Sequence, residues 1–276
     1  MKKSFIILLL LFPVSIFAQE MNIMTFNIRY NNAGDGVNAW PNRIEMVNGL
    51  LNFHEPDIFG LQEALHGQIL DVAKGLPDYE WFGVGRDDGD KAGEFSPIFF
   101  NTKKFILVEK GHFWLSENCE KPGLGWDAAC TRICTWGKFK SKVTGKKFFV
   151  FNTHFDHVGD EARKNSAKLI HEKINEFTAN TGLAVILTGD FNLTPETAPI
   201  SLIKEYLSDS REISETPPYG PIGTFSGFNF EANFDKRIDF IFVRGVKVLK
   251  YAALTDNKDK RWPSDHLPVF VKLQLK

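Results

Sequence analysis

Residues 21–29 of the chain read MNIMTFNIR, and residues 57–63 read DIFGLQE. Both stretches are largely apolar and end on polar side chains, which is typical of buried strands that stop at the edge of a sheet. Residues 40–55 between them carry apolar side chains at spacings of three and four, so we expect a helix there. Short connections of this kind usually join parallel neighbours. The segment therefore predicts a β-α-β unit that brings Asn27 and Glu63 together at one sheet edge.

The rest of the chain continues this mixture of strands and helices. We expect further helices at residues 64–76 and 161–180, with Asp160 as the N-cap of the second. Further strands are expected at residues 81–84, 96–101, 105–108, 112–115, 132–140, 147–153, 183–188, 238–243, 246–252 and 269–275. The combination of β-α-β units and hairpins predicts an α/β sandwich of mixed sheets rather than a doubly wound sheet. No linker or repeat divides residues 19–276, which we expect to form one domain.

Single polar residues follow apolar runs along the whole chain, most clearly in GDFN at 189–192 and SDH at 264–266. Taken alone, each has a structural explanation: Glu63 could help to cap a helix, and Asp190 with Asn192 could form an Asx turn. Turn chemistry does not require so many acids and imidazoles, however, and strand ends are where α/β enzymes place catalytic groups. The set comprises Asn27, Glu63, His154, Asp190, Asn192, Asp239, Asp265 and His266.

These residue types suit the hydrolysis of a phosphate ester. Carboxylate and amide oxygens bind hard cations such as Mg²⁺ or Mn²⁺, and His and Asn can donate hydrogen bonds to phosphate oxygens as charge builds. The chain has no Gly-x-Ser-x-Gly elbow and no Walker loop, which argues against serine hydrolases and P-loop enzymes. Its formal net charge of −1 gives no sign of a nucleic-acid-binding surface, although a local basic groove is compatible with a neutral total.

Six segments resemble motifs of the endonuclease/exonuclease/phosphatase superfamily, which includes deoxyribonucleases, sphingomyelinases and inositol-polyphosphate phosphatases. The segments follow the superfamily's order over nearly all of residues 19–276, and they are TFNIR (25–29), LQE (61–63), NTHFDH (152–157), GDFN (189–192), RIDFIFV (237–243) and SDHLPV (264–269). The resemblance implies a four-layer sandwich, in which two sheets pack face to face between layers of helices. It also implies a site at the sheet edges.

The resemblance implies a metal site on three of these residues. Glu63 of LQE would be the principal ligand of Mg²⁺ or Mn²⁺, and Asn27 of TFNIR would lie beside it. Asp265 of SDH would lie near the metal. Whether one or two ions act is left open by the motifs.

The same resemblance implies catalytic roles for five others. Asp190 would orient or deprotonate the attacking water, and Asn192 would bind the scissile phosphate. His154 would stabilise the pentacovalent phosphorus. His266, paired with Asp239, would act on the phosphate or as an acid/base.

Four residues in loops and at strand ends are candidates for substrate contacts. Arg29 directly follows the first strand end. Arg86 borders the charged loop between residues 85 and 95, and Arg132 borders the loop between residues 116 and 131, in which Trp126 lies. Arginine suits bidentate recognition of phosphate, and a cluster of arginines favours a terminal phosphate over a diester. The alternative is structural, because a loop arginine often pairs with a nearby aspartate and a loop tryptophan often fills a gap in packing.

Four functions are compatible with these features. The leading hypothesis is a metal-dependent phosphoesterase acting on a small phosphorylated molecule such as a sugar phosphate. The second is a secreted nuclease, with nucleic acid as a substrate only; its binding should weaken steeply with salt. A sphingomyelinase-like phospholipase would need an exposed apolar hairpin, and no convincing one is found. An inactive binding protein is disfavoured by the complete polar set.

The N-terminal segment 1–18 predicts a signal peptide. Lys2 and Lys3 precede an apolar run, and Ala18 offers a small residue for cleavage before Gln19. The run is shorter than the roughly 20 apolar residues of a spanning helix. We therefore expect export to the periplasm or the medium, without stable membrane association.

The three cysteines are an odd number, so at least one thiol should stay free. Cys130 and Cys134 fall in one predicted strand, where four residues span roughly 13 Å, too far for a disulfide. A pair between Cys119 and Cys130 stays open, and no cysteine-based zinc site is predicted.

Overall fold

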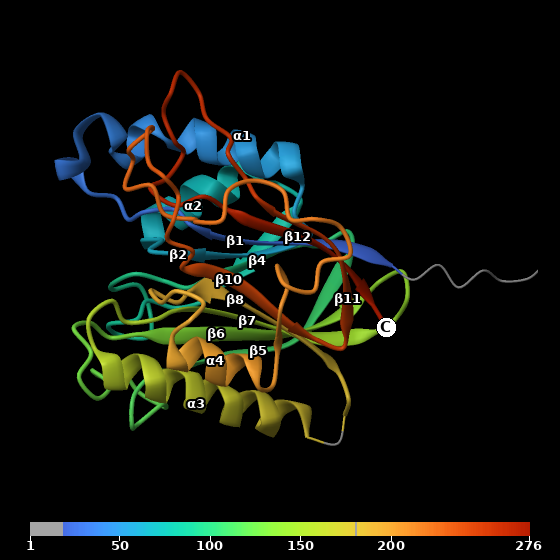
Figure 1. Cartoon of the computed structure of the whole chain (residues 1–276). Helices are drawn as coiled ribbons and strands as arrows, with labels where there is room; N and C mark the ends of the chain where they lie inside the picture. Colours follow the sequence, from blue (N-terminus) through green and yellow to red (C-terminus); the bar gives the residue numbers. More distant parts are fainter. Residues whose placement is uncertain (1–18, 180) are drawn as a thin grey trace, which may run out of the picture.

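The computed structural model describes residues 19–179 and 181–276 and contains two six-stranded β-sheets packed face to face (Figure 1). The predicted signal peptide, residues 1–18, lies outside the described residues. In spatial order, the first sheet consists of β11 (Val246–Ala253), β12 (Val269–Leu275), β1 (Glu20–Asn27), β2 (Ile58–Gln62), β4 (Ile98–Asn101) and β3 (Tyr79–Phe82). The second consists of β5 (Phe105–Trp114), β6 (Ile133–Ser141), β7 (Lys147–His154), β8 (Ala184–Asp190), β10 (Asp239–Arg244) and β9 (Ser208–Asp209).

Helices cover the outer face of each sheet, and this confirms the four-layer α/β sandwich. The first sheet carries α1 (Ile44–His54) and α2 (His66–Gly75), and the second carries α3 (Asp160–Thr178) and α4 (Ala198–Lys204) (Figure 1). Two short 3-10 helices, η1 (Ala33–Asn38) and η2 (Trp40–Asn42), lie between β1 and α1. The segment expected to open the first helix at Trp40 therefore forms a separate turn before it.

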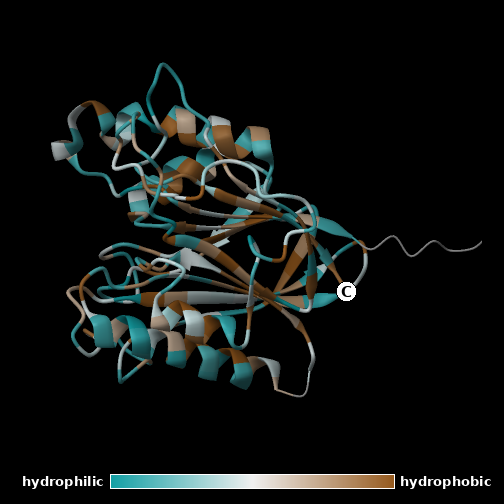
Figure 2. Ribbon diagram, viewed as in Figure 1, coloured by the Kyte–Doolittle hydropathy of each residue, from teal (hydrophilic) through white to brown (hydrophobic). Residues whose placement is uncertain are grey.

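The apolar core has a layer between the sheets and a layer under each pair of helices. Ile23 of β1, Val150 of β7 and Ile186 of β8 belong to one fully buried cluster between the sheets. Leu187, the next residue along β8, faces the opposite way and packs in the same cluster as Ile170 of α3. Successive side chains of a strand point to opposite faces, so a strand buried on both faces is apolar throughout. Most strand segments in Figure 2 are accordingly coloured as hydrophobic.

Buried hydrogen bonds also cross from one sheet to the other. Gln62 Nε2 donates to Asn152 Oδ1 over 2.7 Å, and Asn152 Nδ2 donates to the carbonyl oxygens of Leu61 (2.8 Å) and Pro97 (3.0 Å). Gly60 makes room for this contact, because a Cβ at that position would lie 2.3 Å from Asn152 Cγ. Buried amides are costly to leave unpaired, so these bonds favour one alignment of β2 against β7.

Two local predictions are corrected. The strands expected at 105–108 and 112–115 are one strand, β5, whose pairing with β6 is interrupted by an irregularity between Leu107 and Glu109. Asp160 is the first residue of α3, and Gly159 is its N-cap. The Asp127 carboxylate, 33 residues before α3, accepts hydrogen bonds from backbone N–H groups of the first turn. The sequence analysis also missed α4 and β9.

The cysteines are all free: Cys119 and Cys130 are half-buried, and Cys134 is buried. The pairing left open between Cys119 and Cys130 is therefore not formed, and Cys130 lies before β6 rather than within it. Among residues 19–179 and 181–276, no helix combines the length and apolar character needed to cross a membrane.

Candidate active site

Strand register places the polar residues of the second sheet side by side. His154 at the end of β7 is paired with Asp190 at the end of the parallel strand β8. Asp190 is in turn paired with Asp239 at the start of the antiparallel strand β10. Three side chains that are far apart in the sequence therefore leave the sheet at one edge.

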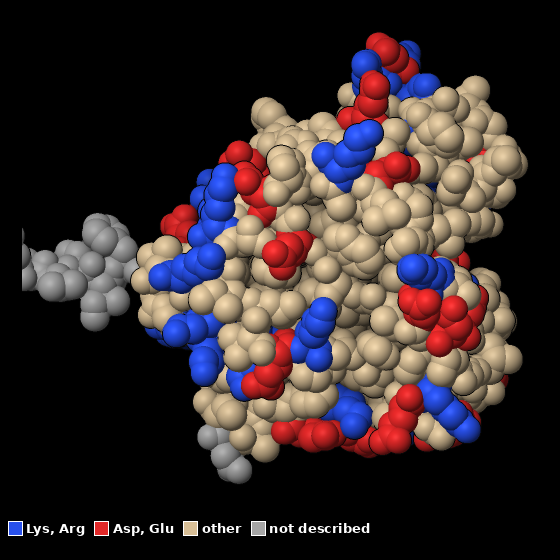
Figure 3. All heavy atoms as spheres, turned by 180° about the vertical axis from the view of Figure 1, so that it is seen from behind, with Lys and Arg blue, Asp and Glu red and all other residues tan. Residues whose placement is uncertain are grey.

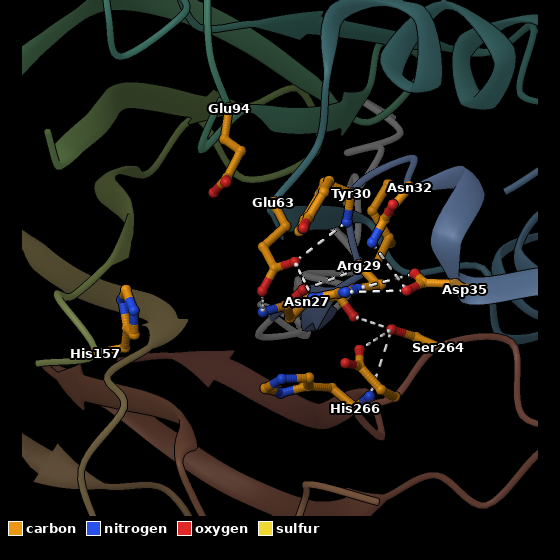
Figure 4. Close-up of polar contacts among 12 residues, drawn as sticks. Asn27, Arg29, Tyr30, Asn32, Asp35, Glu63, Glu94, His157, Ser264 and His266 are labelled. Carbon is orange, nitrogen blue, oxygen red and sulfur yellow. Dashed lines mark hydrogen bonds and ion pairs between the residues drawn. The ribbon is translucent and has the colours of Figure 1, made fainter. Parts of the chain in front are cut away.

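The first sheet supplies the facing residues. β1 and β2 are parallel, as predicted, with Asn27 opposite Gln62, so Glu63 follows immediately beside Asn27. Asn27 Nδ2 donates to Glu63 Oε1 over 3.0 Å and to Asp190 Oδ2 over 2.9 Å. This single amide links the edges of the two sheets. The candidate site thus forms where both sheets meet. Figure 4 shows the first sheet's contribution, with Asn27, Glu63 and His266 close together.

The loop before β12 is held against the end of β1 by two side chains. Ser264 Oγ donates to the Asn27 carbonyl oxygen over 2.7 Å. Arg43, which is fully buried, donates from Nη1 to the carbonyl oxygens of Ile28 and Pro263, both over 2.8 Å. These bonds position Asp265 and His266, and the sequence analysis did not single out Arg43.

His266 lies between two carboxylates. Its Nδ1 is 2.9 Å from Asp239 Oδ2, and its Nε2 is 3.8 Å from Asp190 Oδ2. Burial alone would lower the pKa of His266, but the two carboxylates outweigh it and hold that pKa well above its ordinary value. Burial, followed by repulsion from Asp239, raises the pKa of Asp190 to about 7. Thr224 Oγ1 fixes Asp239 by donating to Oδ2 over 2.6 Å.

His154 and Asn192 form a second polar pair. Asn192 Nδ2 donates to the Phe155 carbonyl oxygen and lies 3.0 Å from His154 Nε2, so this ring nitrogen accepts and Nδ1 carries the proton. Burial, then the nearby Arg132 and Arg86, keep the pKa of His154 well below its ordinary value, and the ring is neutral. Asn192 N also donates to Asp190 Oδ1. The Asx turn weighed as an alternative is therefore present within the site.

Glu63, Asn27 and Asp265 are residues of the site whose side chains could hold a metal ion through oxygen atoms alone. All offer carboxylate or amide oxygens, which suit a hard divalent cation. Burial raises the pKa of Asp265; His266 opposes this shift, and repulsion from Glu63 adds to it. A cation bound here would therefore relieve the repulsion between the two carboxylates. A second group, Asp190, Asp239 and His266, has ligand atoms within 4.8 Å of one another. In that group a protonated imidazole already supplies the positive charge.

A cavity of about 660 Å³ opens onto these residues, and the three predicted arginines line it. Arg29 forms two hydrogen bonds with Asp35, of 3.0 and 3.1 Å, and lies 3.9 Å from Glu63. Arg86 and Arg132 line the cavity together with Glu94. Trp126 is half-buried and is not among the residues that line the cavity, so its predicted substrate contact is not supported.

The cavity also contains residues that the sequence analysis did not single out. They include Tyr30, Glu94, Cys130, His157, Phe225 and Lys236. His157 lies inside the NTHFDH segment, which offered a signal. Glu94 ends a charged loop in which several acids look equally suitable, and only the folded chain shows which of them faces the cavity.

Known proteins resemble this chain in both sequence and structure. The model of the endonuclease/exonuclease/phosphatase family matches residues 24–266. A solved member of that family from Bacteroides thetaiotaomicron is 40% identical, with a TM-score of 0.89, over 94% of this chain and 99% of that one. The mannosyl-6-phosphatase Bt3783 of the same organism is 41% identical, with a TM-score of 0.87, over 92% of this chain and 99% of that one.

A more distant relative is a nuclease subunit. The Ccr4 subunit of the CCR4-Not complex from Aspergillus niger, a 3'-5'-exoribonuclease, is 22% identical over 86% of this chain, which spans about half of its length (48%). Proteins of the matched family are phosphoesterase hydrolases, both phosphatases and nucleases, and generally depend on a divalent metal. The family match covers most of the chain, and this chain belongs to the endonuclease/exonuclease/phosphatase family.

Proposed function

We propose that this protein hydrolyses phosphate monoesters of small metabolites, with sugar phosphates as the preferred class, and that Mg²⁺ or Mn²⁺ serves as its metal. The observation that carries the proposal is the cavity of about 660 Å³, which has the size of a small-molecule site and holds both signs of charge. The 41% identity with a mannosyl-6-phosphatase over almost the whole chain supports the same class of substrate.

We propose the metal residues from the chemistry of their side chains. Glu63, with Asn27 and Asp265 beside it, would hold the ion, which would neutralise charge on the phosphate and on the leaving oxygen. Glu63 is positioned for this by its neighbours, since Oε1 accepts from Asn27 and Oε2 from the backbone N–H of Tyr30. These bonds fix the carboxylate before a substrate enters.

The remaining residues supply the base and the donors. Asp190, with a pKa near neutrality, suits a base that orients and deprotonates the attacking water. His266, charged and aligned by Asp239, would donate to a phosphate oxygen as negative charge develops. Asn192 would exchange its bond with His154 for one with the phosphate, because the same N–H can serve only one of these acceptors.

A secreted nuclease is the second candidate, and the resemblance to Ccr4 favours it. Nucleic-acid binding by phosphate contacts requires an extended basic surface. The face displayed in Figure 3 shows Lys and Arg interleaved with Asp and Glu over much uncharged surface. The net charge of −1 agrees with that distribution and favours the small substrate.

One assay separates the two functions. Phosphate release would be measured from sugar phosphates, nucleotides and inositol phosphates, beside nicking of plasmid DNA and degradation of RNA, with Mg²⁺ and with EDTA. We expect metal-dependent phosphate release from a sugar phosphate and intact nucleic acid. Cleavage of DNA or RNA with little release from monoesters would overturn the proposal in favour of a nuclease.

A further inference from the structure

The cavity has a wall that supplies neither the metal ligands nor the base proposed above, although its Glu94 Oε2 lies 3.9 Å from His154 Nδ1. It consists of Arg86, Glu94, Arg132 and His157, and we call these four residues the polar wall. Arg86 and Glu94 come from the loop between β3 and β4, whereas Arg132 precedes β6 and His157 follows β7. In Figure 4, Glu94 and His157 point into the same space that Glu63 and His266 face. A substrate whose phosphate lies at the metal residues would extend towards this wall.

The polar wall holds buried donors that the rest of the molecule leaves unused. Arg132 is 5% exposed, and its Nη2 hydrogen-bonds with His157 Nδ1 over 3.0 Å. Within the described ranges 19–179 and 181–276, Arg132 Nε and Nη1 and Arg86 Nε have no hydrogen-bond partner. A buried polar group left unpaired costs about 1–3 kcal/mol, so such groups are rare in native proteins unless a ligand uses them.

The charges of the polar wall are balanced. Arg86 Nη1 donates to Glu94 Oε2 over 2.7 Å, which forms one ion pair. Arg132 Nε lies 3.6 Å from Asp156 Oδ1, which forms another. His157 Nδ1 accepts a hydrogen bond from Arg132 Nη2. Because a carboxylate already pairs with each arginine, this wall is a poor site for a second phosphate.

Carboxylate acceptors beside guanidinium donors suit hydroxyl groups. Each hydroxyl donates one hydrogen bond and accepts up to two, so neighbouring hydroxyls of a sugar ring can bond to Glu94 and to an arginine at once. Bonds to charged groups are about twice as strong as neutral ones. A site built on such bonds rejects an analogue without the hydroxyls, because its own buried groups are then unpaired.

We propose that Glu94, held by Arg86 and flanked by Arg132, is the specificity-determining residue that recognises the hydroxyl groups of a sugar phosphate. This inference rests on the proposed function and deepens it, because it assigns the polyhydroxylated part of the substrate to residues distinct from the catalytic set. Glu94 contacts the sugar and takes no part in breaking the phosphate ester bond.

The test compares two substrates that share a phosphate and differ in hydroxyl groups. Mannose 6-phosphate carries a polyhydroxylated ring, whereas 4-nitrophenyl phosphate carries none. In Glu94→Gln we expect kcat/KM for mannose 6-phosphate to fall about 10- to 100-fold and that for 4-nitrophenyl phosphate to change less than about threefold. Glu80→Gln, a change at an exposed position of β3, is the matched control and should alter neither. Equal losses for both substrates in Glu94→Gln would overturn the inference.

A second variant and a binding measurement complete the experiment. If Glu94→Gln does not fold, Arg86→Gln/Glu94→Gln removes both charges and avoids an unpaired buried arginine. Calorimetric binding in EDTA gives a readout besides turnover: either variant should bind mannose 6-phosphate more weakly than the wild type, with inorganic phosphate unchanged.

The failure of the inference and that of the proposed function look different. A wild type that hydrolyses both monoesters, with variants that keep its preference, would leave the function standing and remove the subsite. A wild type that cleaves nucleic acid and neither monoester would overturn the function and the subsite with it.

Discussion

The two sides of the cavity are built differently. The catalytic side, Asn27, Glu63, Asp190, Asp239 and His266, stands on or directly beside strand ends, and its side chains hydrogen-bond to one another or to backbone. The polar wall draws Arg86 and Glu94 from a loop, and three of its buried arginine nitrogens have no hydrogen-bond partner within residues 19–179 and 181–276. A rigid sheet edge holds reacting groups in place, whereas loops can change without loss of the fold. The difference agrees with our proposal that bond breaking and substrate choice rest on separate residues.

The largest effect should follow removal of the metal residue. Glu63→Ala is expected to reduce turnover of every phosphomonoester to background, as EDTA should in the wild type, because no other group replaces the ion's charge on the phosphate. Initial rates with Mg²⁺, Mn²⁺ and EDTA measure this, with Glu80→Ala as the control for a surface change. Full activity of Glu63→Ala without added metal would contradict the metal-binding role of Glu63 and the contrast drawn between the two sides of the cavity.

The next effect should come from the acid-base residues. His266→Ala and Asp190→Ala are each expected to lower kcat by about 10²–10⁴, the range for proton transfer and electrostatic stabilisation. The loss should be the same for mannose 6-phosphate and 4-nitrophenyl phosphate, in contrast to the selective loss expected for Glu94→Gln. A change confined to KM would show that these residues bind substrate and do not act on it.

Arg29 should have a smaller effect because Asp35 already occupies its guanidinium. Arg29→Ala is expected to lower kcat/KM about tenfold for a phosphomonoester and less for bis(4-nitrophenyl) phosphate, since a terminal phosphate carries more charge. Asp35→Asn, which frees the guanidinium, is the companion variant. Equal losses on monoester and diester in Arg29→Ala would remove the argument for a terminal phosphate.

The smallest effect on turnover is expected for Asp156, whose Oδ1 lies 3.6 Å from Arg132 Nε of the polar wall. It is buried, and burial opposes ionisation, but backbone N–H groups of Gly159, Val158 and Ala129, and then Arg132, lower the pKa of Asp156 to about 2. A depressed pKa stabilises the fold above the ordinary carboxyl range, and this stability is lost as the pH falls towards 2. Asp156→Asn should therefore lower the free energy of unfolding by about 2 kcal/mol at pH 7.

Urea unfolding at pH 7 and pH 3 measures this contribution, and the difference between wild type and Asp156→Asn should shrink to about half at the lower pH. The exposed Asp235→Asn is the control. Turnover of 4-nitrophenyl phosphate should change less than threefold. A pH-independent difference in stability would contradict the assigned cause.

The contrast between the two sides also explains what could be predicted from the sequence. Asn27 and Glu63 follow apolar runs whose strand character is readable, so their meeting at one edge followed from topology. Asp190 ends a strand of the other sheet, and its place in the same site was implied only by the resemblance. Glu94 and Arg43 carry no such signal, because the direction of a loop or helix side chain depends on distant segments. The same holds for Trp126, whose substrate contact stays a prediction: its backbone N–H bonds to the Glu117 carboxylate, and it is not among the residues that line the cavity.

The buried bonds between Gln62 and Asn152 have a consequence for how this scaffold can diversify. A purely apolar interface would let one sheet shift against the other by a residue step of about 3.3 Å, which would separate Glu63 from Asp190. The amide pair, with Gly60 beneath it, permits a single registration. Residues 86–94 lie outside these contacts, so we expect that they can change to accept new substrates while the alignment is kept. A change at 60, 62 or 152 is instead expected to disturb the alignment of the polar residues without touching a substrate.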